Sequence, residues 1–372
     1  MNDPVFLTGA SGFIGGELTE RLLATGRRVR VLARRPLPSL EKLGAEIVRG
    51  DLHDPEALRR GCTGIGTVFH VAGRVGVWGP DADFFRVNVG GTRNVIAACR
   101  TAGVPRLVYT SSPSVVYTGG NLSGVDESAP LCTAAPCAYP TSKAAAERLV
   151  TAAHSPELAA ISLRPHLVWG PGDRNVVPRV LALAKKRRLR ILGSGRNLVD
   201  CTHITNVVDA HLLAEQALVK CHLMDGASRG SVPAESHVIR DIPSGKPKDN
   251  CHLIGDNGSR ADAGGRAYFI TNGEPVVLWD WINKLLRGVG MPEITKHVPL
   301  RAAYCVGGLL EALWTLLPLA GEPPMTRFVA KELATDHWFD ISAAQRDLGY
   351  APRVTMAAGT AELIAHLKRE GF

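Results

Sequence analysis

Residues 5–15, VFLTGASGFIG, place a short apolar run directly before three glycines that recur at every third position. The next ten residues carry apolar side chains at helical spacing, so the stretch predicts a strand, a tight turn and a helix. Gly9, Gly12 and Gly15 would let the backbone turn, let a pyrophosphate approach, and let the helix pack on the strand. We interpret the stretch as a dinucleotide-binding site at the helix N-terminus; a purely structural turn is the alternative.

Alternating strands and helices continue from this stretch as far as residue 164. Five further strand-like runs are separated by helical patterns, at residues 29–33, 46–49, 67–71, 106–110 and 160–164. Such alternation predicts an α/β fold with a Rossmann-type, doubly wound parallel sheet. We expect residues 1–168 to form the dinucleotide-binding domain, with segments near 198–218 returning to it. Residues 169–372 would then form a smaller, mainly helical substrate-binding part.

The end of the second strand indicates which dinucleotide binds. Folds of this kind usually place an acidic residue there to bind the adenosine ribose, but this chain has Ala33 followed by Arg34 and Arg35. Two guanidinium groups without a carboxylate favour a 2′-phosphate. The sequence therefore predicts NADP(H) as the preferred cofactor, with NAD(H) as a second possibility; two solvated arginines are the alternative.

Later strand ends supply further candidate contacts, because the ligand of a doubly wound sheet lies across the carboxyl ends of its strands. Asp51 and Leu52 could flank adenine, and Ala72 and Gly73 could admit the pyrophosphate and ribose. An equally good role for Asp51 is to cap the helix expected at residues 55–61.

A tyrosine and a lysine four residues apart, Tyr139 and Lys143, come where a helix over residues 142–153 should begin. On a helix the two side chains share a face, so the ammonium could lower the pKa of the phenol and make Tyr139 a proton donor or acceptor. The strand at 106–110 ends in the hydroxyls of Ser111 and Ser112, one of which could hold a substrate oxygen. By itself each pattern also fits an ordinary helix start or loop. Asn88, within a helix expected at residues 84–100, is interpreted as a structural hydrogen-bonding residue.

The composition is that of a soluble globular protein: 372 residues, 45% apolar and 21% charged. The net charge of +8 is spread along the chain except at residues 185–188, KKRR, which no aromatic residues accompany. We interpret that run as a solvated helix face and expect no nucleic-acid partner. The eight cysteines lack the spacing of a disulfide framework, and the N-terminus lacks a secretion signal, which together favour the cytoplasm.

Several motifs in one order resemble the extended short-chain dehydrogenase/reductases, and among them the 3β-hydroxysteroid dehydrogenase type. They are TGASGFIG (8–15), GDL (50–52), VNVGGTRN (87–94), YTSS (109–112), YPTSK (139–143) and RPHLVWGPGD (164–173). The resemblance covers residues 4–218 and resumes over 265–366. Ser114-Val115-Val116 and residues 321–335 make the chain similar to bacterial 2-alkyl-3-oxoalkanoate reductases and to sterol dehydrogenases.

The resemblance implies hydride transfer between a nicotinamide and a secondary alcohol or ketone on a bulky apolar substrate, a steroid or a long-chain 2-alkyl-3-oxoalkanoate. It assigns catalysis to Ser112, Tyr139 and Lys143. It also assigns the pyrophosphate to Gly9, Gly12 and Gly15. Together with the contacts inferred from the strand ends, the candidate cofactor-binding residues are Gly9, Ser11, Gly12, Phe13, Ile14, Gly15, Arg34, Asp51, Leu52, Ala72, Gly73, Ser111, Tyr139, Lys143 and Pro165. A nucleotide-sugar epimerase or dehydratase, or a non-catalytic NAD(P)-sensing regulator, is the alternative.

Two segments of the C-terminal half depart from simple expectations. Residues 219–263 have the composition of a long surface loop, and their two Cys-His pairs, 221–222 and 251–252, are not expected to bind metal. Residues 300–320 are almost entirely apolar but are interrupted by Glu311 and Pro318. We expect an amphipathic helix that roofs the substrate pocket, with peripheral membrane contact as the alternative. Its pocket-facing side would carry Leu309, Leu310, Leu313, Trp314 and Leu317. A homodimer is a further possibility.

Overall fold

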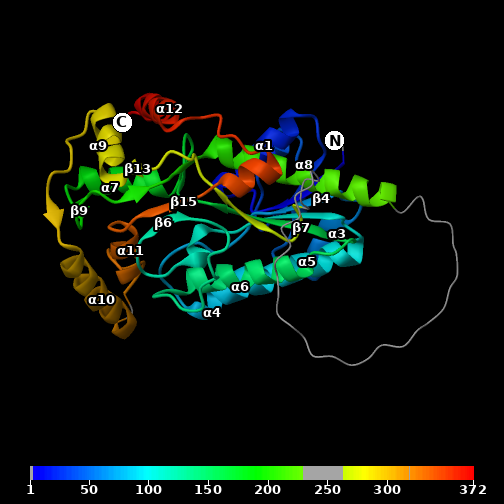
Figure 1. The fold of residues 1–372 in the computed structure, drawn as a ribbon, viewed down its shortest axis with the longest axis horizontal. Coiled ribbons are helices and arrows are strands. Elements are labelled where there is room, and N and C mark those ends of the chain that lie inside the picture. The colour runs from blue at the N-terminus through cyan, green and yellow to red at the C-terminus, as the bar shows by residue number, and fades with distance from the viewer. Residues whose placement is uncertain (1–2, 229–262, 318) are drawn as a thin grey trace, which may run out of the picture.

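A seven-stranded parallel sheet forms the centre of the computed structural model, which describes residues 3–228, 263–317 and 319–372 (Figure 1). The strand order is β12-β7-β5-β4-β1-β2-β3, and every neighbouring pair is parallel. The strands are β1 (Val5–Thr8), β2 (Val29–Ala33), β3 (Glu46–Arg49), β4 (Thr67–His70), β5 (Arg106–Thr110), β7 (Ala159–Pro165) and β12 (Ala267–Ile270). The predicted fold class is confirmed.

Helices cover both faces of this sheet, as Figure 1 shows. One layer contains α1 (Phe13–Ala24) and α8 (Ile204–Ser228), and the other contains α3 (Pro55–Cys62), α5 (Gly91–Ala102) and α6 (Ala138–Ala153). Successive side chains of β1 enter opposite layers, Leu7 the first and Phe6 the second, and both are fully buried. Burial on both faces explains why the central strands read as continuous apolar runs.

A third apolar cluster, besides those on the two faces of the central sheet, lies around Trp169 and Trp279. A four-stranded sheet has the order β13-β10-β15-β6, and two strand pairs, β11-β8 and β14-β9, flank it. The strands are β6 (Leu122–Val125), β8 (Val168–Trp169), β9 (Ile191–Leu192), β10 (Leu198–Val199), β11 (Thr202–His203), β13 (Val276–Val277), β14 (His297–Val298) and β15 (His337–Phe339). The helices are α7 (Val176–Lys185), α9 (Leu278–Gly288), α10 (Leu300–Leu316), α11 (Arg327–Glu332) and α12 (Met356–Arg369). Short helices α2 (Pro38–Lys42) and α4 (Asp81–Phe84) and the turns Pro113–Val116 and Ala344–Leu348 complete the chain.

Three predicted segments differ in detail. The helix expected at 84–100 is interrupted by a π-helical turn, Phe85–Gly90, before α5 begins. The basic run is not a helix face, because α7 ends at Lys185 and Arg187 has a left-handed backbone with φ of 52°. The loop expected at 219–263 is wrong for residues 219–228, because α8 continues to Ser228.

Two further expectations, on metal binding and on the domain boundary, stay untested. Residues 229–262, with Cys251 and His252, lie outside the described part of the chain, so the metal expectation there stays a prediction. Residues 267–270, expected in the substrate-binding part, lie in the central sheet, and the proposed domain boundary also stays a prediction. Within the described residues, no helix is long and apolar enough to cross a membrane.

Candidate active site

The glycine loop combines close packing with one open position. A Cβ on Gly15 would lie 2.2 Å from the Gly9 carbonyl oxygen, and one on Gly9, whose φ is 86°, would lie 2.6 Å from the Ala72 nitrogen. A Cβ on Gly12 would meet only the Gly9 oxygen, at 3.3 Å. Helix α1 has no side-chain cap at Gly12 and no acidic residue in its first turn. Its first amide groups are therefore free to bind an anion, and the loop fits a dinucleotide pyrophosphate.

The other predicted cofactor-binding residues of the glycine loop lie at or near the surface. Ser11 and Gly12 are exposed, and Phe13 and Ile14 are half-buried at the start of α1.

A buried histidine holds the glycine loop against its neighbours. Thr92 donates its hydroxyl to the Asn88 carbonyl (2.6 Å), so it accepts from Nε2 of His70 at 2.9 Å. Nδ1 of His70 is then the acceptor for the Thr8 hydroxyl at 2.8 Å, and Thr8 accepts from the Ala72 amide at 3.3 Å. This network requires neutral imidazole, and burial lowers the pKa of His70 to about 3. It links the residue before the glycine loop to the end of β4, and no local sequence pattern indicates it.

The residues expected to contact the adenosine part of the cofactor are only partly placed as expected. Arg34 is exposed at the end of β2. Asp51 is also exposed and accepts from the His53 amide at 2.7 Å, whereas Asp54 is the residue that caps α3. The capping role considered for Asp51 is therefore wrong. The side chain of Leu52 is buried, so it contributes little surface to a ligand.

The end of β4 lies beside the predicted catalytic lysine. A Cβ on the exposed Gly73 would lie 3.8 Å from Nζ of Lys143 and 3.2 Å from Oδ1 of Asn88. Asn88 accepts from the Arg74 amide at 2.7 Å and donates to the Arg74 carbonyl and to the Ser142 hydroxyl. It connects the π-helical turn, the segment after β4 and α6, as expected of a structural hydrogen-bonding residue.

The predicted serine and tyrosine are in contact. The Ser112 side chain acts on the Tyr139 phenol as a hydrogen-bonding group that lowers its pKa. Ser112 caps the turn Pro113–Val116, and its hydroxyl lies 3.0 Å from that of Ser114. Ser114 was not predicted, although its place two residues after a strand-end serine was a usable signal. Ser111 is buried and its hydroxyl has no partner among the described residues.

The pKa values of Tyr139 and Lys143 differ from expectation. Burial raises the pKa of Tyr139, and its hydrogen bond with Ser112 only partly opposes this. Burial lowers the pKa of Lys143 to about 7. The Lys143 ammonium donates to the Thr110 carbonyl at 2.6 Å and lies 4.4 Å from the centre of the Tyr109 ring. The expected lowering of the Tyr139 pKa by Lys143 is therefore wrong for the protein without its cofactor, because burial is the largest cause of the shift and the Lys143 charge is not among the causes.

A buried ion pair fixes the helix that carries both groups. Glu147, one turn beyond Lys143 on α6, accepts from Nε and NH2 of Arg164 at 3.1 and 2.6 Å. Both side chains are buried, and Arg164 belongs to β7. A bidentate ion pair of this kind fixes the position of α6 along the sheet.

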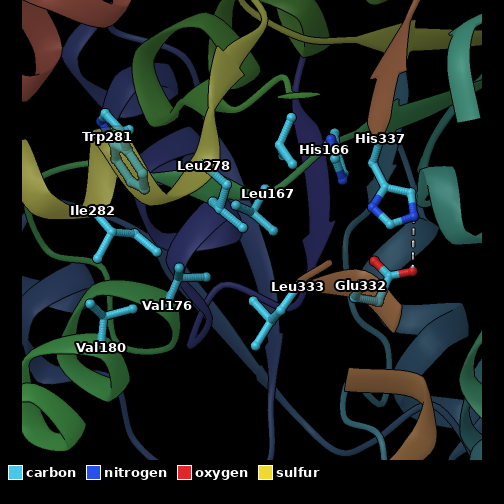
Figure 2. A pocket seen from close by; sticks show the side chains of 11 residues that line it. His166, Leu167, Val176, Val180, Leu278, Trp281, Ile282, Glu332, Leu333 and His337 are labelled. Atoms are coloured by element: carbon cyan, nitrogen blue, oxygen red, sulfur yellow. Dashed lines mark ion pairs between the residues drawn. The ribbon is translucent and has the colours of Figure 1, made fainter. Parts of the chain in front are cut away.

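An apolar cavity of about 90 Å³ begins just after β7, where Pro165 leads to His166 and Leu167 (Figure 2). Side chains from α7, α9 and α11 contribute to its wall, and the full lining is His166, Leu167, Val176, Val180, Val199, Leu278, Trp281, Ile282, Glu332, Leu333 and His337. At one end Nδ1 of His166 lies 3.0 Å from Asp200, and His337 lies 3.6 Å from Glu332. Burial is the main cause of the raised pKa of Tyr139, and the charge of Glu332, at this end of the cavity, is a smaller cause.

Helix α10 does not line this cavity, so its expected role as a roof over the substrate pocket gains no support here and stays a prediction. Its buried residues are Ala303, Gly307 and Glu311. The buried face of the helix carries Gly307 and Glu311. The side that was expected to face the pocket is therefore partly exposed and partly half-buried. On that side Leu309, Leu313 and Leu317 are exposed, and Leu310 and Trp314 are half-buried.

A known protein family matches more than half of the chain. A model of the 3-beta hydroxysteroid dehydrogenase/isomerase family covers residues 6–232. The chain belongs to this family. A 2-alkyl-3-oxoalkanoate reductase of Stenotrophomonas maltophilia (strain K279a) is 39% identical over 364 residues, which are 97% of this chain and 98% of that protein. A sterol-4-alpha-carboxylate 3-dehydrogenase, decarboxylating, of Bos taurus is 31% identical and covers 94% of this chain and 88% of its own length.

A solved structure described as MoeE5 in complex with UDP-glucose and NAD is also similar, with a TM-score of 0.66 and 26% identity over 99% of each chain. As a member of the 3-beta hydroxysteroid dehydrogenase/isomerase family, the chain is an NAD(P)-dependent oxidoreductase that acts on hydroxyl and keto groups. It is therefore an enzyme and not a cofactor-sensing regulator.

Proposed function

We propose that this family member interconverts a ketone and a secondary alcohol on a bulky apolar substrate, with Ser112, Tyr139 and Lys143 as its catalytic residues. The observation that carries the proposal is the placement of the Ser112 side chain where it acts on the Tyr139 phenol, with Lys143 one helical turn further along α6. The exposed Gly73 lies beside Lys143, so the catalytic residues and the glycine loop share one edge of the sheet.

In the reducing direction, Ser112 donates a hydrogen bond to the substrate oxygen and Tyr139 gives that oxygen its proton. Its raised pKa keeps Tyr139 in the protonated form that this step needs. Lys143 places a positive charge next to the developing phenolate. When bound, the nicotinamide supplies the hydride that the carbonyl carbon accepts. In the oxidising direction the same residues act in reverse.

NADP(H) is the preferred cofactor in this proposal. Arg34 and Arg35 are both exposed at the end of β2, where a 2′-phosphate of a dinucleotide would lie. Neither is in an ion pair with any residue that the structure describes, so both can bind a phosphate. The glycine loop would hold the pyrophosphate, and Ala72, Gly73 and Pro165 would line the path to the nicotinamide.

The substrate class follows from the cavity after β7. Its wall is apolar except for His166, Glu332 and His337, which suits a hydrocarbon better than a diphosphosugar. Of the two relatives compared, the 2-alkyl-3-oxoalkanoate reductase is the more similar. We therefore favour a long-chain 2-alkyl-3-oxoalkanoate, with a sterol as the second candidate.

A substrate series tests this assignment. We expect kcat/KM with NADPH to rise about fourfold for each methylene added to a 3-oxoalkanoate until the cavity is full, since each buried methylene contributes about 0.8 kcal/mol. Val180→Trp should abolish this rise, because Val180 lines the cavity. Ala182→Trp, on the exposed face of the same helix, is the matched control and should preserve it.

Two outcomes would overturn the substrate assignment. One is a flat dependence of kcat/KM on chain length in the wild type, and the other is efficient turnover of a UDP-sugar. A sterol ketone that is turned over faster than every 3-oxoalkanoate would select the second candidate instead.

The setting of the enzyme is also a proposal. We place it in the cytoplasm, because its cysteine spacing suits a reducing compartment. A homodimer and a peripheral membrane contact through residues 300–320 stay predictions, which molar mass in solution and vesicle flotation measure.

A further inference from the structure

Arg74, just after β4, has a guanidinium group that the rest of the chain leaves largely unpaired. Its Nε atom is buried and has no hydrogen-bond partner among the described residues. Its closest carboxylate in that part of the chain is Asp83, 3.9 Å from Nη1, which is too far for a hydrogen bond. The side chain is 38% exposed, so a ligand can reach it. Because an unpaired buried N–H of a charged group costs free energy, this guanidinium is suited to bind an anion.

Two neighbours hold the guanidinium in place without accepting its hydrogen bonds. Its Cζ atom lies 4.9 Å from the centre of the buried Phe84 ring, and a guanidinium stacked on a ring keeps the N–H groups at its edge available. Gly79, whose φ is 129°, leaves room for Nη2, since a Cβ there would lie 2.9 Å from that atom. The group is therefore oriented before any ligand binds, which lowers the entropy cost of binding.

The backbone of Arg74 is fixed beside the helix that carries the proposed catalytic residues. Asn88 accepts from the Arg74 amide at 2.7 Å, donates to its carbonyl at 3.1 Å, and donates to the Ser142 hydroxyl at 3.0 Å. Ser142 directly precedes Lys143 on α6. A Cβ on Gly73, the residue before Arg74, would lie 3.8 Å from Nζ of Lys143. The side chain of Arg74 therefore starts next to the proposed catalytic residues.

The segment that follows Arg74 connects the two halves of the chain. Helix α4, which begins at Asp81, packs against α6 (Figure 1). A Cβ on Gly76 would lie 3.5 Å from Oε1 of Glu322, and Glu322 lies 3.6 Å from Arg179 of α7. Residues 74–80 thus lie between the helix of the catalytic residues and the half of the chain in which we expect the substrate.

We propose that Arg74 binds the carboxylate of the substrate. This inference rests on the proposed function, in which the substrate is a 2-alkyl-3-oxoalkanoate. In such an acid the carboxylate carbon is two bonds away from the ketone carbon that accepts the hydride, so the group that binds the carboxylate must lie close to the proton donor. A guanidinium can donate two parallel hydrogen bonds to a carboxylate. Arg74 would therefore orient the ketone and select an acid over a neutral ketone.

Lys143 and Lys331 are poorer candidates for this role. The Lys143 ammonium donates to the Thr110 carbonyl at 2.6 Å, and the Lys331 ammonium donates to the Gly119 carbonyl at 2.6 Å. Each lysine thus already has a backbone partner. An ammonium group also lacks the planar pair of donors that fits a carboxylate.

A pair of substrates tests the proposal: a 3-oxoalkanoate and its methyl ester, which has the same chain but no charge. Arg74→Met removes the charge and keeps a hydrocarbon stem against Phe84. At saturating NADPH we expect this variant to raise KM for the acid about 10- to 100-fold and to leave KM for the ester within about twofold of the wild type. Arg74→Lys restores the charge without the paired hydrogen bonds, so it should give an intermediate KM for the acid.

Two further variants serve as controls. Arg86→Met removes another guanidinium near Asp83, at 3.8 Å from that carboxylate, and should leave both KM values unchanged. Lys331→Met removes the rival cation and should not change the ratio of the two KM values. NADPH affinity, measured for every variant by fluorescence titration, shows that the cofactor site is intact. If Arg74→Met loses NADPH binding, Arg74→Lys decides alone, and a KM ratio equal to that of the wild type would then overturn the proposal.

Several results would contradict the assignment of Arg74. Equal effects of Arg74→Met on the acid and the ester would show that Arg74 only supports its loop, and no effect on either would show that it does not contact the substrate. A loss specific to the acid in Lys331→Met, but not in Arg74→Met, would assign the carboxylate to Lys331. A wild type that reduces the ester alone would overturn the role of Arg74 and leave ketone reduction standing. If the wild type reduces neither compound, the proposed function fails, and this inference fails with it.

Discussion

The pKa of the Tyr139 phenol is raised in the cofactor-free protein, because burial disfavours the phenolate more than the Ser112 side chain favours it. The same burial brings the pKa of Lys143 down to about 7. An anionic cofactor close to Lys143 would favour its charged form, and that charge would in turn favour the phenolate. In our proposal, binding of the cofactor therefore prepares the proton transfer.

Arg34 gives a prediction at this scale. Arg34→Ala should weaken NADPH binding about 10- to 100-fold, since a hydrogen bond to a charged group contributes about 1.5–3 kcal/mol. NADH affinity should stay the same, because NADH has no 2′-phosphate. Fluorescence titration of both cofactors measures the two affinities.

Arg28→Ala, just before the opposite end of the same strand, is the control and should leave both affinities unchanged. A wild type that binds NADH as tightly as NADPH would refute the assignment of the arginines.

At the scale of elements, the glycines of the loop have two different roles: one allows close packing of α1, and another leaves space for a ligand. Gly15 has no room for a side chain, because the Gly9 carbonyl lies against it. Gly12 has room on its outer side. Gly15 thus serves the packing of α1 on the sheet, and Gly12 leaves space for a ligand.

Substitutions at these two glycines should therefore differ. Gly15→Ala should destabilise the fold by several kcal/mol, because a clash of this kind forces the backbone to shift. Gly12→Ala should change the free energy of unfolding by less than about 1 kcal/mol but weaken NADPH binding. Urea unfolding and cofactor titration check the two effects, and equal destabilisation by both variants would contradict the distinction.

Much of this element pattern could be predicted from the sequence, because strands buried on both faces and glycine turns leave strong local signals. The candidate serine, tyrosine and lysine were predicted from a strand end, a spacing at a helix start and a family resemblance, and their catalytic role stays a prediction. Which face of α10 is exposed could not be predicted, since it depends on the ion pair between Glu311 and Arg327 of the next helix. The directions of the pKa shifts and the His70 network also depend on contacts between residues far apart in the chain.

At the scale of the whole molecule, buried neutral histidines join the layers around the sheet. His211, on α8, donates from Nδ1 to the Val207 carbonyl and accepts from the Thr110 hydroxyl of β5 at 2.7 Å. Burial lowers its pKa to about 4, and it lowers the pKa of His70 to about 3. Both networks are broken when the imidazole gains a proton.

The pH dependence of stability follows from these values. The folded-state pKa of each histidine lies below the unfolded value of about 6.5, so the unfolded chain binds more protons between these limits. The free energy of unfolding should fall as pH drops below about 6.5, by up to about 1.4 kcal/mol per pH unit for each histidine. His211→Gln should remove one such contribution from the slope. Urea unfolding between neutral and mildly acidic pH measures it, and an identical slope in the variant would contradict the prediction.

The most direct measurement of the central claim is kcat and NADPH affinity for Tyr139→Phe, compared with Tyr117→Phe, which removes a hydroxyl from another buried tyrosine. We predict that Tyr139→Phe lowers kcat by about 10²- to 10⁴-fold, the usual contribution of general acid–base catalysis, while its NADPH affinity stays within about twofold of the wild type. Tyr117→Phe should retain most of the activity. If Tyr139→Phe keeps more than about a tenth of the wild-type kcat, Tyr139 is not the proton donor.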